Sequence, residues 1–79
     1  MTTYTITTRN GQRFTVEAKS YHLAAEKARV ELLRRKDGTI PRGIAQQVSG
    51  NHGQSGWFQA YKRLDGQNYT SVGEQFHVS

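Results

Sequence analysis

The sequence predicts a small α+β protein, a two-layer sandwich in which one helix packs on one face of an antiparallel sheet. Three observations carry this prediction: one segment with helical periodicity, a β-hairpin pattern before it, and a second hairpin pattern after it. The 79 residues suffice for a single domain, residues 1–79, with a thin hydrophobic core. We therefore expect a hairpin, one helix, and then two or three strands.

The helix is expected to run from Ser20 to Gly38. Ser20 suits the N-cap, because its hydroxyl can accept from a free amide of the first turn. Gly38 can adopt the left-handed conformation that often ends a helix. Small and apolar side chains recur at helical spacing and form a flat face that suits a sheet: Tyr21, Ala24, Ala25, Ala28 and Leu32.

A second apolar stripe lies on the opposite side of this helix and consists of Leu23, Val30 and Leu33. Exposed aliphatic side chains grouped in one patch need a cover in so small a protein. Segment 40–48 folding back over the stripe is the first interpretation. The alternative is a symmetric homodimer packed through it, so a monomer is expected with the dimer as its rival.

Residues 1–19 predict the first hairpin, because apolar residues alternate with threonines and charged residues. A three-residue loop, Arg9-Asn10-Gly11, pairs Ile6 with Phe14 and Tyr4 with Val16. This register is preferred because it places the apolar side chains of both strands on one face.

Segments Trp57–Arg63 and Asn68–Val78 predict the second hairpin, around a loop of similar composition. A three-residue loop pairs Arg63 with Gln67, Tyr61 with Tyr69 and Phe58 with Val72, and the second strand can bend at Gly73. This register directs one set of apolar residues inward and the other aromatics outward.

The middle of the chain, Thr39 to Gly56, allows two interpretations. Ile44 and Val48 alternate with polar residues as in a strand, but with Ile40 they are also spaced by four, as in a short helix. The strand is preferred, because residues 49–56 have the composition of a long, mobile hairpin loop. The predicted core then comprises Tyr4, Ile6, Phe14, Val16, Ala18, Ala24, Ala28, Leu32, Phe58, Ala60, Val72, Phe76 and Val78.

No constellation of residues in the sequence predicts catalysis, a metal site or a cofactor site. The chain has no cysteine, and no histidine has a second ligand at metal spacing. His22, His52 and His77 are each interpreted as solvated side chains. The glycine-rich loop before Trp57 lacks the following helix that a phosphate-binding loop requires. We therefore expect a protein that is not an enzyme.

The formal net charge of +5 predicts a polyanion or an acidic protein surface as the partner. No apolar run has the length of a membrane span, and no segment has the pattern of a signal peptide. A cytoplasmic protein without membrane contact is therefore expected.

Two groups of residues are the candidate partner-binding sites. The first is the outer sheet face, where aromatics beside cations suit single-stranded nucleic acid or a protein hot spot: Trp57, Tyr61, Arg63 and Tyr69. The second is the basic set at the helix end: Arg34, Arg35, Lys36 and Arg42. A register shifted by one residue would instead bury Trp57 and Tyr61. The basic set could also serve only the helix dipole and solubility.

The strand Phe14–Ser20 leads directly into the helical segment Ala24–Ala28. With the small size, the basic charge and the ββα order followed by antiparallel strands, the chain resembles some anti-CRISPR proteins of phages and mobile elements. This resemblance implies a non-enzymatic inhibitor that binds a CRISPR–Cas effector complex in the host cytoplasm. It would interfere with target DNA binding or with nuclease recruitment. A small basic nucleic-acid-binding module or regulator is the alternative.

Overall fold

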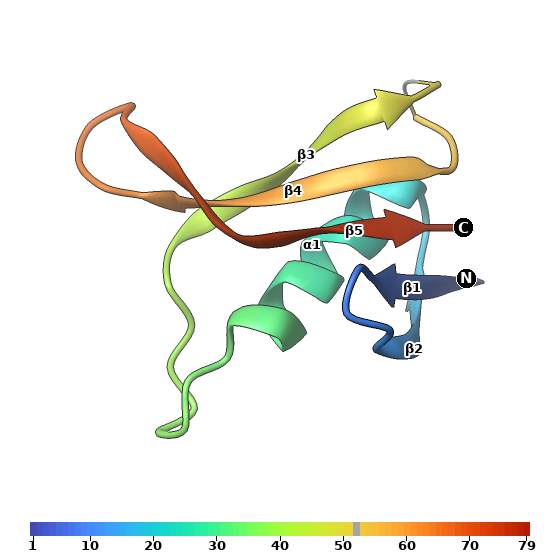
Figure 1. Ribbon diagram of the computed structural model, residues 1–79, viewed down its shortest axis with the longest axis horizontal. Coiled ribbons are helices and arrows are strands. Elements are labelled where there is room, and N and C mark those ends of the chain that lie inside the picture. The colour runs from blue at the N-terminus through green and yellow to red at the C-terminus, as the bar shows by residue number, and fades with distance from the viewer. Residues whose placement is uncertain (52) are drawn as a thin grey trace.

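Five antiparallel strands form one open sheet, and a single helix packs against one of its faces (Figure 1). The computed structural model describes residues 1–51 and 53–79, so the prediction for His52 lies outside the described residues. The predicted two-layer α+β fold is confirmed. The elements in chain order are β1 (Thr2–Thr8), β2 (Arg13–Ala18), α1 (Tyr21–Leu33), β3 (Gly43–Gly50), β4 (Gly56–Arg63) and β5 (Tyr69–Val78).

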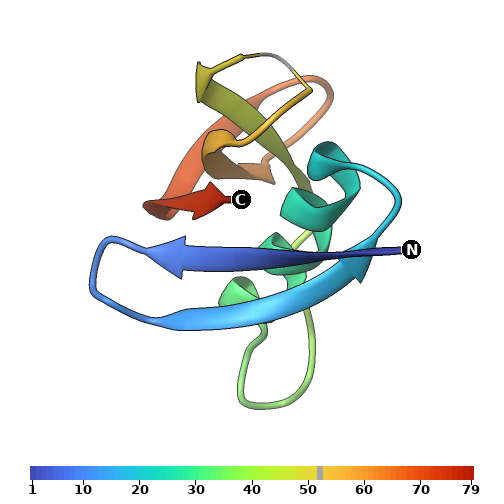
Figure 2. The same cartoon turned by 90° about the vertical axis from the view of Figure 1, so that its right-hand side faces the viewer.

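The strands are arranged in the order β2-β1-β5-β4-β3, so the last strand lies in the centre of the sheet. Pairing of β1 with β5 joins the two hairpins, with Ile6 opposite Val78 and Thr7 opposite His77. The strands twist strongly across the sheet, and α1 lies along the concave side (Figure 2). This non-local pairing brings the first hairpin loop next to the C-terminal strand.

The first hairpin has the predicted register. Ile6 pairs with Phe14 and Tyr4 with Val16. The amide of Thr8 donates to the carbonyl of Gln12 at 2.9 Å, which closes the three-residue loop. Gly11 has a φ of 93°, which glycine adopts without the penalty that other residues incur.

The predicted register of the second hairpin is wrong by two residues. The amide of Leu64 donates to the carbonyl of Asn68 at 2.8 Å, so the loop is Asp65-Gly66-Gln67. Arg63 consequently pairs with Tyr69 rather than with Gln67. A shift of two residues keeps every side chain on its predicted face, because side chains alternate with a period of two.

A bulge with two extra residues in β5 displaces the register between β4 and β5 a second time. Phe58 pairs with Phe76 and Ala60 with Val72, so three residues of β5 lie opposite Gln59 alone. The buried amide of Gln59 fills this bulge, where its Nε2 donates to the carbonyls of Ala60, Val72 and Gly73 at 3.1, 3.2 and 3.3 Å. The predicted bend at Gly73 is confirmed by its φ of 69°.

Within the middle segment a strand forms rather than a helix, as preferred, but this strand, β3, is longer than expected. It begins at Gly43 and continues to Gly50, and it contains a bulge between Gln47 and Ser49. The connection to β4 is therefore residues 51–55 rather than 49–56.

The helix begins at the predicted N-cap but ends earlier than predicted. The amide of Leu23 donates to the hydroxyl of Ser20 at 3.2 Å. Arg34 is already extended, so the helix does not reach Gly38. The side chain of Asp37 accepts from the amide and hydroxyl of Thr39, and such local bonds compete with helical ones. Gly38, at a φ of 86°, belongs to this turn.

Most of the predicted core is buried between α1 and the sheet. Phe58 and Phe76 stack at its centre, with ring centroids 6.3 Å apart. Phe14, Val16 and Leu32 are half-buried and pack against the core, while Val72, displaced by the bulge, is half-buried outside it. The buried apolar residues are Tyr4, Ile6, Ala18, Ala24, Ala25, Ala28, Ala45, Phe58, Ala60, Phe76 and Val78.

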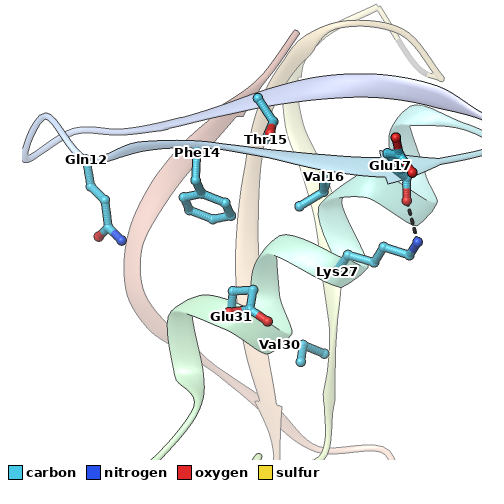
Figure 3. Close-up of a pocket in the computed structure, with 8 residues that line it drawn as sticks. All are labelled: Gln12, Phe14, Thr15, Val16, Glu17, Lys27, Val30 and Glu31. Atoms are coloured by element: carbon cyan, nitrogen blue, oxygen red, sulfur yellow. Dashed lines mark hydrogen bonds between the residues drawn. The ribbon is translucent and has the colours of Figure 1, made fainter.

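The second apolar stripe of the helix is divided among three environments. Leu33 packs against the core, which corrects its predicted position on the opposite face. Val30 is half-buried and lines a groove between β2 and α1, beside Phe14 and Val16 (Figure 3). Leu23 is exposed, and segment 40–48 does not cover it. The predicted fold-back over the stripe is therefore wrong.

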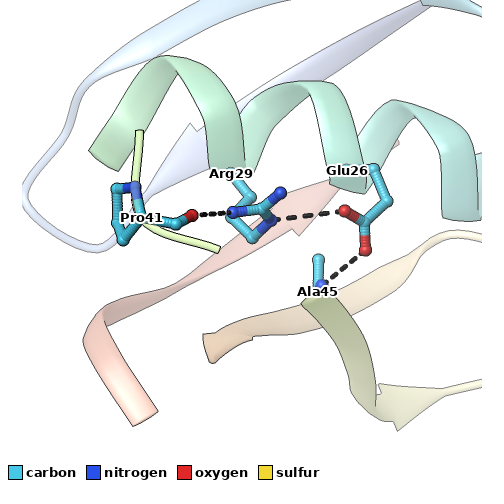
Figure 4. A network of polar contacts seen from close by, with 4 residues as sticks. All are labelled: Glu26, Arg29, Pro41 and Ala45. Atoms are coloured by element: carbon cyan, nitrogen blue, oxygen red, sulfur yellow. Dashed lines mark hydrogen bonds and ion pairs between the residues drawn. The ribbon is translucent and has the colours of Figure 1, made fainter. Parts of the chain in front are cut away.

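Segment 40–48 instead joins α1 through a polar network (Figure 4). Glu26 accepts from the amide of Ala45 at 2.6 Å and pairs with Arg29 at 3.2 Å, while Arg29 donates to the carbonyl of Pro41 at 3.0 Å. The side chain of Arg29 is almost fully buried, and a buried charge without a partner would destabilise the fold. These bonds supply its partners. Within residues 1–51 and 53–79, no helix has the length and apolar character needed to cross a bilayer.

Candidate functional site

Among the residues that the structure describes, none forms a second layer on the face of the sheet opposite α1, and this face is the candidate site (Figures 1 and 2). Strand register decides which side chains share this face, because cross-strand partners point the same way. Ile6 and Phe14 are packed toward the helix, so Thr7 and Arg13 lie on the outer face. The register extends this row through His77 and Trp57 to Ser49.

Trp57 lies on the outer face, as predicted, but it does not stand alone. It is half-buried and meets His77 of β5 edge to face, with ring centroids 5.2 Å apart. The guanidinium of Arg9 lies over the indole at 4.3 Å from its centroid, within the range of a cation–π contact. Arg9 also donates to the side chain of Gln75 at 3.3 Å. We call Arg9, Trp57, Gln75 and His77 the tryptophan cluster.

The interpretation of His77 as a solvated side chain is wrong, because it is half-buried against Trp57. His22 is exposed on α1, as expected. The sequence predicted Arg9 only as a residue of the first hairpin loop and did not predict its contact with Trp57. Its place beside Trp57 depends on the β1–β5 pairing, and no local pattern reports a pairing between strands so far apart in the chain.

A second group of site residues gathers at the far end of the same face, and we call Arg42, Tyr61, Arg63 and Tyr69 the sheet-end cluster. Arg63 pairs directly with Tyr69, and its amide donates to the carbonyl of Arg42 at 2.7 Å. Its Nε bonds the carbonyl of Gly66 at 2.8 Å, which bends the guanidinium back over the hairpin loop. Tyr61 is half-buried between Ile44 and Ser71.

The two clusters share a face but are separated along it. Trp57 and Arg63 are the near and far ends of one strand, and six residues of extended chain span about 20 Å. The cations Arg9, Arg13 and Arg63 lie on this face or at its ends, with Glu17 as an acidic neighbour. The face therefore offers two aromatic anchors within a mainly positive surface.

The structure does not bring the remaining basic residues to this face. Arg34, Arg35 and Lys36 belong to the connection between α1 and β3, on the helix side of the sheet (Figure 1). Their prediction as the last helical turn is wrong, because the helix ends at Leu33. Arg34 bonds the exposed carboxylate of Glu31 at 3.0 Å.

The described residues contain no group of three or more metal-ligating acids and histidines close enough to hold an ion. Hydrogen bonds from the hydroxyl and the amide of Thr39 lower the pKa of Asp37, which is fully exposed in a turn. This shift has a local structural cause and lies away from both clusters. The chemistry that the candidate site offers is therefore ring packing and positive charge.

A scan against models of known protein families and a search of curated proteins give no match to this chain.

Proposed function

We propose that this chain is a non-enzymatic inhibitor from a phage or mobile element, an anti-CRISPR protein that binds a CRISPR–Cas effector complex. The observation that carries the proposal is the tryptophan cluster on an uncovered sheet face, where Arg9 and His77 hold the indole of Trp57 in one orientation. The sequence resemblance in size, charge and strand–helix order supplies the target class.

A tryptophan whose ring is held by neighbouring side chains is a good anchor for binding another protein's surface. Its ring buries much area on contact, and its orientation is already restricted, so little conformational entropy is lost on binding. Interfaces concentrate their energy in such residues, especially Trp, Tyr and Arg. The tryptophan cluster supplies two of these residue types in direct contact.

The positive charge serves recognition of a nucleoprotein. Exposed cations on the outer face, together with Arg34, Arg35 and Lys36 on the helix side, steer the chain toward the acidic or phosphate-rich surface of the complex. The chain then occupies the surface where target DNA binds or where the nuclease is recruited. Inhibition follows from occupancy and requires no bond to be broken.

The second candidate function is direct binding of nucleic acid, and the sheet-end cluster favours it. Tyr69 is exposed and lies opposite Arg63, an arrangement on which a base can stack beside a phosphate contact. Arg42 is also exposed at this end of the sheet. This cluster could alternatively form the rim of the protein interface.

One experiment tests the proposal and separates the two candidates. Purified effector complexes of several types are each mixed with labelled target DNA, with and without the chain. We expect the chain to copurify with one complex after nuclease treatment, and either DNA binding or cleavage to fall. Binding to free DNA or RNA that weakens steeply with salt, with no effect on any complex, supports the nucleic-acid-binding module instead.

A further inference from the structure

The two edges of the sheet differ in the outward group that the helix bonds: Lys27 bonds a carbonyl of β2, whereas Glu26 bonds an amide of β3. Strand β2 is at the end of the strand order and pairs with β1 alone. Strand β3 is at the opposite end, but Glu26 of α1 accepts from the outward amide of Ala45. An open edge presents free amides and carbonyls that can pair with another strand.

Three residues of β2 direct their backbone groups to this open edge. The backbone of Thr5 forms two hydrogen bonds with Ser79, the residue after β5, at 2.8 and 3.0 Å, so it faces away from β2. Its partner Thr15 therefore turns its own amide and carbonyl outward, because antiparallel pairs alternate. Arg13 and Glu17 follow with the same period. The carbonyl of Glu17 also faces outward, and it accepts from the ammonium of Lys27, which must release it when a second strand pairs with β2.

We propose that a second copy of this chain pairs with β2 about a twofold axis at Thr15. The sequence Arg13-Phe14-Thr15-Val16-Glu17 is complementary to its own reverse. Antiparallel pairing centred on Thr15 places Arg13 of each copy opposite Glu17 of the other on the outer face. It places Phe14 opposite Val16 on the helix side. Once Lys27 releases the carbonyl of Glu17, the outward backbone groups of residues 13, 15 and 17 all meet a partner.

The groove between β2 and α1 fits the same arrangement. Phe14, Val16 and Val30 form its apolar lining, and a twofold axis at Thr15 joins the grooves of the two copies into one (Figure 3). Lys27 lies at the Glu17 end of the groove and Glu31 lies toward the Phe14 end (Figure 3). The twofold axis reverses one copy, so Lys27 of each approaches Glu31 of the other.

This dimer has a consequence for binding. The two sheets join edge to edge with both helices on one side, so both tryptophan clusters face the opposite side. Two anchors on one rigid face allow simultaneous contacts, which raises the overall affinity for a target with repeated subunits. Twofold pairing is also the commonest form of self-association.

A charge-swap series tests the pairing by light scattering across a concentration range. The variants are Arg13→Glu, Glu17→Arg and the double swap. Each single variant places like charges opposite each other at both ends of the strand pair, so we expect its dimer dissociation constant to rise roughly tenfold or more. The double swap restores the complementarity, and we expect dimerisation near that of the wild type.

A wild type that stays monomeric up to near-millimolar concentration overturns the proposal, and so do single variants that dimerise like the wild type. Both substituted residues are exposed, so the fold is expected to persist, which circular dichroism checks. Hydrogen exchange of the wild type gives a readout without substitution. The amide of Thr15 is protected in the dimer and exchanges on dilution. Protection that appears only with a different protein present assigns the edge to that partner and overturns pairing with a second copy.

Discussion

The carboxylate of Glu26 on α1 accepts a hydrogen bond from the backbone amide of Ala45 on β3 at 2.6 Å, and it also neutralises Arg29. A single side chain thereby bonds one outward amide of the edge strand β3 and balances a nearly buried cation (Figure 4). The helix and β3 are held together by this contact in addition to their small apolar residues.

Glu26→Ala should destabilise the fold by about 2 kcal/mol, because it leaves the guanidinium of Arg29 and the amide of Ala45 without their acceptor. Urea unfolding measures the loss. Glu31→Ala is the matched control: Glu31 pairs with Arg34 at the same spacing, but both side chains are about half exposed, so the loss should stay below about 0.5 kcal/mol. Equal losses in the two variants would contradict the role given to Glu26.

Gln59→Ala should lower the free energy of unfolding by about 1–3 kcal/mol, because carbonyls inside the β5 bulge lose their donor. Gln59→Glu should be worse, since a carboxylate would face those carbonyls. Gln46, the exposed cross-strand neighbour of Gln59 on β3, is the control position, and Gln46→Ala should change stability little. A Gln59→Ala variant as stable as the Gln46 control would show that the bulge does not depend on this amide.

Arg9→Ala should alter the fluorescence of Trp57, the only tryptophan in the chain, because the guanidinium that covers its ring is removed. The emission maximum should shift to longer wavelength as water reaches the indole. The cation–π contact contributes roughly 0.5–1 kcal/mol at such a site, so unfolding should shift only slightly. Arg13→Ala, on the same outer row but without this contact, serves as the control. An unchanged spectrum in Arg9→Ala would mean that Arg9 does not cover Trp57.

Thr39→Ala should raise the pKa of Asp37 toward its ordinary value, because the hydroxyl of Thr39 is the largest cause of the lowering. A carboxyl whose pKa is lowered by folding binds fewer protons in the folded state, so its contribution to stability is present above the unfolded pKa. That contribution is lost as the pH falls through the folded pKa. Titration of the Asp37 side chain by NMR in both proteins measures the shift. Identical titration curves would exclude the bond.

Sequence patterns predict which face of the sheet each side chain occupies, but they do not predict the register between strands. The alternation around Phe58 and Trp57 fixes which side chains point inward, and a two-residue error in the hairpin register leaves that result intact. The bulge itself could not be foreseen, because Gln59 satisfies it with a side chain whose partners become known only in three dimensions. The outer aromatics were therefore predictable, and their pairing was not.

The helix end and the tryptophan cluster were missed for a different reason. The basic run after Leu33 has good helix propensity, but the Asp37–Thr39 turn redirects the chain toward β3, and tertiary structure overrides local preference. Arg9 reaches Trp57 only because β1 pairs with β5 across most of the chain. Such long-range pairings leave no signal in local periodicity.

We propose that Trp57 anchors this chain to a CRISPR–Cas effector complex, and the affinity of that complex for Trp57→Ala tests this proposal. We expect the dissociation constant to rise roughly thirtyfold, about 2 kcal/mol, with the fold intact by circular dichroism. His22→Ala, an exposed aromatic change on the helix side, should bind like the wild type. Wild-type affinity in a folded Trp57→Ala variant would show that Trp57 is not the anchor, and no binding of the wild type to any effector complex would overturn the proposed function.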